Sequence, residues 1–257
     1  MTPVALTIAG SDPSGGAGLQ ADLKTFHRFG VYGEAVVTLI TVQNTRGVTR
    51  VDTLPGDLVA AQIRAVLEDV PPLAAKTGAL GSKEVVAVVA AAAADFRFPL
   101  VVDPVMISKH GAKLLDQDSE RSLIEQLVPR ATLLTPNLDE AAAITGLAVK
   151  DRDSMLRAAE KLRALGAANV LVKGGHLEGA ALDLLLTPEG VYEYTAARIP
   201  TPHTHGSGCT YAAAITASLA KGVALSEAVR IAKDFVTRAI RTNPGLGSGQ
   251  GPLNHFA

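Results

Sequence analysis

The amino-acid sequence predicts an α/β fold, a three-layer α/β/α sandwich built around a mainly parallel central sheet. Short apolar, β-branched runs alternate with longer segments of helical periodicity along most of the chain. No repeat, low-complexity linker or shift in composition interrupts this alternation. The chain has 257 residues, of which 47% are hydrophobic, so it is long enough to bury one sizeable core. We therefore expect a single domain over residues 1–257.

The expected elements follow one another in a regular order. The chain starts with a buried strand in VALTIAG and a helix in GLQADLKTFHRFG, which Gly30 ends. Further strands are expected in EAVVTLITVQ, LAAKTG, LVVDPV, ATLLTP and ANVLVKGG. Further helices are expected in PGDLVAAQIRAVLEDV, SKEVVAVVAAAAADF, NLDEAAAITG and DSMLRAAEKLRALG. A hairpin that turns at residues 188–190 and two helices near 208–221 and 226–242 complete the series, before an irregular glycine-rich tail.

Composition and charge exclude several classes of protein. The formal net charge is -1, and no basic excess or basic amphipathic segment predicts a nucleic-acid or membrane partner. The single cysteine excludes an internal disulfide framework and is typical of a reducing compartment. The first residues, MTPVALTIAGSD, lack the pattern of a signal peptide. We therefore expect a cytoplasmic protein.

Polar and glycine residues follow one predicted strand after another. In an open parallel sheet, ligands bind outside the carboxyl ends of the strands, so these residues are expected to gather at one edge. They are the loop 10–18, Gln43, Thr77 with Gly78, Asp103, Asn137 with Glu140, and the segment from Lys173 to His176. The loop 10–18 matches neither a Walker A loop nor a dinucleotide fingerprint, so it is either a tight turn or a close approach to a ligand.

The only cysteine, Cys209, follows Gly206, Ser207 and Gly208 at the start of a predicted helix. Backbone N–H groups at a helix start, together with the helix dipole, form an anion site that can stabilise a phosphoryl group in transfer. The same positive potential predicts a thiol pKa below the free value of about 8.5, so that the thiol could accept a proton from a hydroxyl group. In the alternative interpretation, Cys209 is a small buried apolar residue.

Four more residues have both a ligand-binding and a structural interpretation. Asp103 at a strand end could hold Mg²⁺ through water, or it could simply end the strand. Asn137 and Glu140 have the spacing of a capping box, which explains the pair without a ligand, although both roles can coexist. Lys173 could neutralise phosphate oxygens or could be a solvated lysine.

The segments TIAGSDPSGGAGLQADLKTF, VVDPVM, TPNLDEA, VKGGH and HTHGSGCTYAAAI occur in this order and span nearly the whole chain. This ordered set resembles the hydroxymethylpyrimidine/phosphomethylpyrimidine kinases of thiamine biosynthesis, in the ribokinase-like superfamily. The resemblance implies ATP-dependent, Mg²⁺-assisted phosphorylation of 4-amino-5-hydroxymethyl-2-methylpyrimidine, and then of its monophosphate to the diphosphate. It also implies a homodimer.

The resemblance assigns roles to three groups of residues. The catalytic group is the anion hole of Gly206, Ser207 and Gly208, with Cys209 as the base and Lys173 beside it. The pyrimidine-binding group is Gln43, Gly10, Asp22 and Val42. The Mg-ATP group is Asp103 and Glu140 for the metal, with Asn137, Lys173, Thr204 and Lys233 for the nucleotide. The chain departs from the family at Ala79, where members often carry a methionine that would pack on the substrate ring.

Two other functions fit parts of the sequence. A pyridoxal kinase would share the same loops, but Gln43 favours a pyrimidine because an amide can pair with a ring nitrogen and an exocyclic amine. A non-catalytic vitamin- or nucleotide-binding sensor would share the fold. The intact Gly-Ser-Gly-Cys stretch, together with Asp103 and Glu140, argues against such a sensor.

Overall fold

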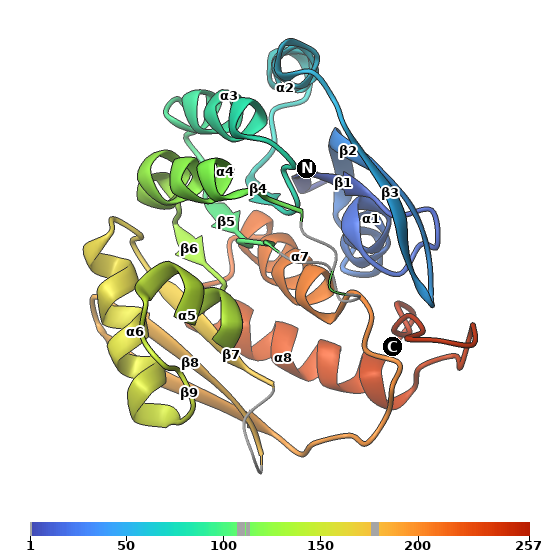
Figure 1. Cartoon of the computed structure of the whole chain (residues 1–257), viewed down its shortest axis with the longest axis vertical. Helices are drawn as coiled ribbons and strands as arrows, with labels where there is room; N and C mark the ends of the chain where they lie inside the picture. Colours follow the sequence, from blue (N-terminus) through green and yellow to red (C-terminus); the bar gives the residue numbers. More distant parts are fainter. Residues whose placement is uncertain (1, 107–110, 112–113, 176–179) are drawn as a thin grey trace.

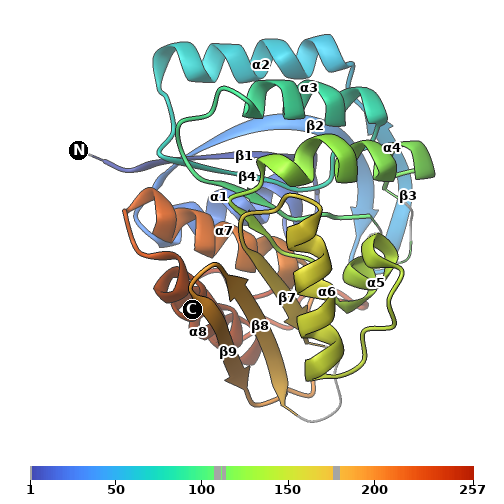
Figure 2. The ribbon, with the colours of Figure 1, turned by 90° about the vertical axis from the view of Figure 1, so that its left-hand side faces the viewer.

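The computed structural model describes residues 2–106, 111, 114–175 and 180–257. A nine-stranded sheet forms the centre and helices cover both of its faces, which confirms the predicted three-layer α/β/α architecture (Figure 1 and Figure 2). The strand order is β3-β2-β1-β4-β5-β6-β7-β8-β9. The six inner strands, β2, β1, β4, β5, β6 and β7, run parallel to one another. At the two ends of the sheet, β3 pairs antiparallel with β2, β8 pairs antiparallel with β7, and β9 pairs antiparallel with β8.

The strands of the sheet are short in its middle and longer toward its ends. They are β1 (Val4–Ser11), β2 (Tyr32–Asn44), β3 (Gly47–Thr53), β4 (Ala74–Thr77), β5 (Leu100–Val102), β6 (Leu133–Leu134), β7 (Val170–Gly174), β8 (Ala181–Thr187) and β9 (Gly190–Ala196). Alternate residues of each parallel strand pack into opposite layers, as the pleat requires. In β7, for example, Val170 and Val172 join one buried cluster while Leu171 joins another.

The helices divide between the two faces. One face carries α1 (Gly18–Arg28), α7 (Ser207–Ala220) and α8 (Leu225–Arg241). The other carries α2 (Gly56–Asp69), α3 (Lys83–Ala93), α4 (Gln117–Ser122), a π-helical turn (Leu123–Leu127), α5 (Leu138–Thr145) and α6 (Arg152–Ala164). No helix within the described residues is both long and apolar enough to cross a membrane.

Helix α7 occupies the middle of its layer, and its sequence explains why. It packs against α1, α8 and the strands β1, β4 and β5, so it is buried on nearly every side. Its sequence SGCTYAAAITASLA is rich in small residues, which let neighbouring backbones approach closely from several directions. This packing fixes the first turn of α7 at the edge of the sheet where the parallel strands end.

Every strand and helix named from the sequence is present, including the hairpin β8–β9 and its turn at 188–189. The sequence analysis missed β3 and α4. Strand β3 is an exposed antiparallel edge whose Arg50 and Asp52 interrupt the apolar pattern. Helix α4 is a single polar segment, QDSERS, without an apolar stripe to reveal it.

Candidate active site

A cavity of about 860 Å³ opens where the parallel strands end and α7 begins. The glycine-rich loop after β1, the ends of β2, β4, β5 and β7, and the first turn of α7 all contribute to its wall. Twelve residues selected from the sequence line it: Gly10, Gln43, Asp103, Asn137, Glu140, Lys173, Thr204, Gly206, Ser207, Gly208, Cys209 and Lys233. The edge predicted from the strand order is therefore where these residues converge.

Two residues expected on the pyrimidine side do not line the cavity. Asp22 is fully buried beneath it, where it accepts hydrogen bonds from Lys76 (2.8 Å) and from the Thr7 hydroxyl (2.6 Å). Val42 is 51% exposed, because its strand neighbours Thr41 and Gln43 face the cavity and the pleat turns Val42 to the opposite side. His176, which the sequence placed at the same edge, lies outside the described residues.

The first turn of α7 depends on glycine at Gly206. Its φ of 77° lies in the left-handed region, and a Cβ there would collide with the carbonyl oxygen of Gly16. The Ser207 N–H donates to the Thr204 carbonyl oxygen (3.2 Å), while the N–H groups at a helix start have no carbonyl one turn back within the helix. These amides form the wall of the cavity, as an anion site requires.

Gly208 brings this helix start next to charged side chains. A Cβ on Gly208 would lie 3.4 Å from Lys173 Nζ and 3.8 Å from Asp103 Oδ2. Lys173 Nζ in turn lies 2.8 Å from Asp103 Oδ1, which also accepts a hydrogen bond from the Thr135 hydroxyl (3.1 Å). Burial by itself would lower the pKa of Lys173, but Asp103 and Glu140 raise it above its ordinary value. The site therefore holds a charged lysine beside the helix start.

Asn137 and Glu140 form the capping box that their spacing predicts. The Glu140 N–H donates to Asn137 Oδ1 and the Asn137 N–H donates to Glu140 Oε2, each at 2.8 Å. Burial raises the pKa of Glu140 to about 7, Lys173 opposes this rise, and the nearby Asp103 adds to it. The cap thus places a second carboxylate near Asp103 at the cavity wall.

These two carboxylates fit a magnesium ion that arrives with a nucleotide. Among the described residues, no group of three or more His, Cys, Asp or Glu side chains is arranged to hold a metal by itself. Mg²⁺ usually keeps several waters and binds through one or two carboxylates together with phosphate oxygens. Burial is the main cause of the raised pKa of Glu140 and the charge of Asp103 adds to it, so a divalent cation near these carboxylates would offset part of the cost of their charge.

The thiol of Cys209 differs from its expected state. Burial raises the pKa of Cys209 to about 11, so the predicted lowering is wrong. The Lys76 ammonium opposes the rise, whereas the carboxylates of Asp22 and Asp103 add to it. Removal of the thiolate from water therefore outweighs the positive potential of the helix start.

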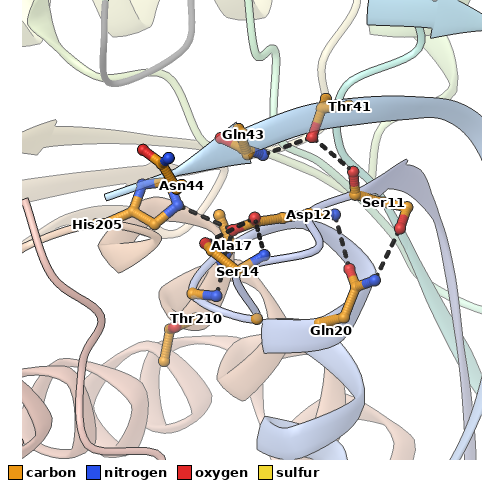
Figure 3. A network of polar contacts seen from close by, with 12 residues as sticks. Ser11, Asp12, Ser14, Ala17, Gln20, Thr41, Gln43, Asn44, His205 and Thr210 are labelled. Atoms are coloured by element: carbon orange, nitrogen blue, oxygen red, sulfur yellow. Dashed lines mark hydrogen bonds and ion pairs between the residues drawn. The ribbon is translucent and has the colours of Figure 1, made fainter. Parts of the chain in front are cut away.

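On the opposite side of the cavity, Gln43 is held by a short chain of hydrogen bonds (Figure 3). Gln43 Nε2 donates to the Thr41 hydroxyl (2.8 Å), which donates to the carbonyl oxygen of Ser11 (2.9 Å). Gly10 lies close by, and a Cβ there would collide with the side chain of Leu39. Ala79, the departure from the family pattern, also lines the cavity.

The sequence analysis missed Asp12, which organises the glycine-rich loop (Figure 3). Its carboxylate accepts hydrogen bonds from Ser14 N (2.8 Å), Ser14 Oγ (2.7 Å) and Ala17 N (2.8 Å), and lies 2.9 Å from His205 Nε2. An aspartate before Pro-Ser-Gly-Gly is typical of a side chain that bonds its own turn, and this signal could have revealed it. Because His205 precedes Gly206, Asp12 connects the loop to the anion site.

Lys233 lies at the far end of the cavity in a pair of its own. Its Nζ lies 2.7 Å from Asp183 Oδ2 and donates to the carbonyl oxygen of Ala181 (3.0 Å). Asp183 Oδ1 accepts the backbone N–H of Gly174, at the end of β7 (3.0 Å). This lysine therefore also ties α8 to strands β7 and β8.

Comparisons with known proteins agree with this geometry. Residues 12–254 match a family described as phosphomethylpyrimidine kinase. The chain is 49% identical to a hydroxymethylpyrimidine/phosphomethylpyrimidine kinase of Rhizobium meliloti, over 100% of this chain and 98% of the relative. It is also 47% identical to the thiamine biosynthesis bifunctional protein ThiED of Geobacter sulfurreducens, of which it spans 52%.

Two solved structures extend the comparison. A phosphomethylpyrimidine kinase of Clostridium difficile superimposes with a TM-score of 0.83 at 44% identity, covering 93% of this chain and 100% of the other. An ADP complex of Bacillus subtilis pyridoxal kinase superimposes with a TM-score of 0.91 at 39% identity, covering 99% and 98%. The fold is thus shared with kinases of both kinds.

Proposed function

The chain belongs to the phosphomethylpyrimidine kinase family, and from this premise we propose that it transfers the γ-phosphoryl group of ATP to hydroxymethylpyrimidine and then to the resulting monophosphate. One observation carries the proposal: the first turn of α7 faces Lys173 and Asp103 in the same cavity that Gln43 lines. An anion site, a charged lysine and an amide that can pair with a heterocycle therefore surround one space.

In the first reaction, an alcohol oxygen attacks phosphorus while the bond to the ADP oxygen breaks. The amides at the start of α7 and the Lys173 ammonium stabilise the charge on the transferred group. Asp103 and Glu140 would hold Mg²⁺, which neutralises phosphate charge when bound. The alcohol must lose a proton, and Cys209, which lines the same cavity, would accept it as a thiolate.

In the second reaction, the nucleophile is a phosphate oxygen that already carries negative charge. No base is needed, but two phosphoryl groups have to approach each other against their repulsion. The anion site and Lys173 supply the positive potential for this approach. The two reactions therefore use the same charges and differ in their need for Cys209.

Gln43 is our candidate for pyrimidine recognition. Its amide can donate to a ring nitrogen and accept from the exocyclic amine, a pairing that a pyridine ring offers less completely. Its Nε2 donates to the Thr41 hydroxyl. Substrate binding would exchange this contact for one to the ring.

Pyridoxal phosphorylation is the second candidate, favoured by the superposition on the Bacillus subtilis pyridoxal kinase. The identity to this pyridoxal kinase, 39%, is lower than the 49% to the Rhizobium meliloti pyrimidine kinase. We therefore propose the pyrimidine as the main substrate. A pyridoxal kinase would show the reverse preference in kcat/KM.

The test is ADP release by the purified protein with Mg-ATP and each of three acceptors: the pyrimidine alcohol, its monophosphate and pyridoxal. We expect turnover with the first two, and products identified by mass as the monophosphate and the diphosphate. A higher kcat/KM for pyridoxal would replace the main proposal with the second. No acceptor-dependent ADP release would leave only a binding function. Light scattering on the same sample tests the proposed homodimer, which would have twice the chain mass of 26.5 kDa.

A further inference from the structure

An ion pair with no solvent-exposed surface lies at the cavity wall, to which Lys76 contributes and behind which Asp22 is buried. Lys76 of β4 and Asp22 of α1 are both 0% exposed, and Lys76 Nζ lies 2.8 Å from Asp22 Oδ2. The Thr7 hydroxyl donates to the same oxygen (2.6 Å), while Asp22 Oδ1 has no hydrogen-bond partner among the described residues. Such a pair is costly to bury, and hydrophobic residues of similar volume often serve stability equally well. Stability alone therefore gives no reason for its position.

The pair lies close enough to Cys209 for both of its charges to act on the thiol. Helix α7, which carries Cys209, packs against both α1 and β4, the elements that carry Asp22 and Lys76. Lys76 and Cys209 both line the cavity. The Lys76 charge and a backbone hydrogen bond from Gly18 both lower the pKa of Cys209. Burial raises this pKa and is the larger effect.

Among the described residues, the charges that act on the thiol balance one another before it ionises. Lys76 faces it from β4 and Asp22 from α1, while Asp103 faces it after β5 and is itself paired with Lys173 of β7. In the part of the chain that the structure describes, two ammonium groups thus meet two carboxylates. A thiolate would add one unbalanced negative charge in a place with little water, which accounts for the resistance of Cys209 to ionisation.

We propose that Lys76 and Asp22 are positioning residues that set the protonation state of Cys209 through their charges, with Lys76 favouring the thiolate and Asp22 opposing it. This inference deepens the proposed function, because the thiolate is the form that can take the proton of the alcohol. In that step the alcohol proton moves to sulfur, and the alcohol oxygen forms its bond to phosphorus as the bond to ADP breaks. Neither Lys76 nor Asp22 touches the reacting atoms.

The experiment uses the only cysteine of the chain as its own reporter. The rate at which a small neutral aromatic disulfide modifies Cys209 is measured without nucleotide or substrate, as a function of pH. A one-unit fall in pKa increases the thiolate fraction about tenfold, and the weaker nucleophilicity of the more acidic thiol reduces the gain to about threefold. The readout does not depend on kinase activity, so a failed kinase assay and a failed inference remain distinguishable.

The proposal makes predictions of opposite sign. Asp22→Asn leaves the Lys76 charge without its partner and is expected to increase the modification rate at about pH 8 at least threefold. Lys76→Met leaves Asp22 unbalanced and is expected to decrease the rate at least about threefold. The control is Thr7→Val, which removes a neutral hydrogen bond to the same carboxylate and keeps every charge. Its rate is expected to stay within about twofold of the wild type.

Two results would overturn the proposal. One is a change of the same sign in Asp22→Asn and Lys76→Met. The other is a rate in either variant no different from that of Thr7→Val. If Lys76→Met alone does not fold, Asp22→Asn is compared with the double variant Asp22→Asn/Lys76→Met, in which no buried charge is left alone. The double variant must then react at least about threefold more slowly than Asp22→Asn, and an equal rate rejects the role of Lys76.

Discussion

Replacing Gly208 with alanine tests the anion site most directly. The new Cβ would lie 3.4 Å from Lys173 Nζ and 3.8 Å from Asp103 Oδ2, which are ordinary van der Waals separations. The fold can therefore accept the methyl group. The same methyl group would occupy the space between the first turn of α7 and Lys173, where the transferred phosphoryl group has to lie.

The expected effects on activity and stability have opposite signs. Alanine keeps the backbone N–H, but its methyl group would push the transferred group away from the donors of this turn. Loss of a single oxyanion-hole contact costs about 10²–10³ in rate, so we expect kcat/KM to fall by about that factor in both reactions. Alanine is more stable than glycine within a helix by about 0.5–1 kcal/mol. For a chain of this size, each kcal/mol shifts Tm by about 2–4 °C, so Tm should rise by about 1–4 °C.

The assay pairs ADP release for both substrates with thermal unfolding of the same preparations. Gly47→Ala is a matched control, because a Cβ on Gly47 meets no heavy atom within 4 Å and Gly47 does not line the cavity. It should keep its activity. Activity of Gly208→Ala within about threefold of the wild type, or a loss of activity that parallels a fall in Tm, would refute the reasoning.

Three further predictions concern neighbouring features. Gly206→Ala forces alanine into the left-handed region and against the Gly16 carbonyl, so Tm should fall by at least about 4 °C, and an unchanged Tm would contradict the packing described. Cys209→Ala should slow the first reaction by about 10²–10⁴ and the second by less than about tenfold, and equal losses in paired assays would exclude Cys209 as the base. Burial and the nearby Asp69 raise the pKa of Glu34 from 4.5 to about 7. Between these two pH values, Glu34 keeps its proton in the folded state but has lost it in the unfolded state. Stability from Glu34 then falls as pH rises from about 4.5 toward 7, so Glu34→Gln should raise Tm at about pH 8 and have less effect at about pH 5; the same change in Tm at both pH values would contradict this.

Much of the fold could be predicted because burial leaves a periodic pattern in the sequence. Leu6 and Ile8 of β1 belong to one layer and Ala5 to the other, and the run VALTIAG shows this double burial as a continuous apolar stretch. Strand β3 left no such pattern, because an antiparallel edge strand can face water with residues such as Arg50.

The candidate site could be predicted as a location, since strand order brings the carboxyl ends of parallel strands to one edge. The contacts between side chains within the site could not be predicted from the sequence. Lys76 and Asp22 are 54 residues apart in the chain, and only the packing of α1 on β1, the strand that pairs with β4, reveals that they pair. The protonation of Cys209 was mispredicted for a related reason: a helix start is visible in the sequence, but the depth of its burial is not.

Among the described residues, three lysine–carboxylate pairs lie around the cavity, and they differ in what they can exchange for a ligand. Lys76 is fully enclosed, so its charge acts only through space. Lys233 holds both Asp183 and the Ala181 carbonyl, and Asp183 in turn holds the end of β7, so releasing it would loosen the sheet. Lys173 has Asp103 as its hydrogen-bonded partner and faces the helix start. If Lys173 turned toward a phosphate oxygen, Asp103 Oδ1 would keep the Thr135 hydroxyl and lose its ammonium partner, which leaves the charge of the carboxylate for a cation. Lys173 is therefore the lysine that can follow a phosphoryl group without disturbing the fold, and we expect the nucleotide to displace this pair first.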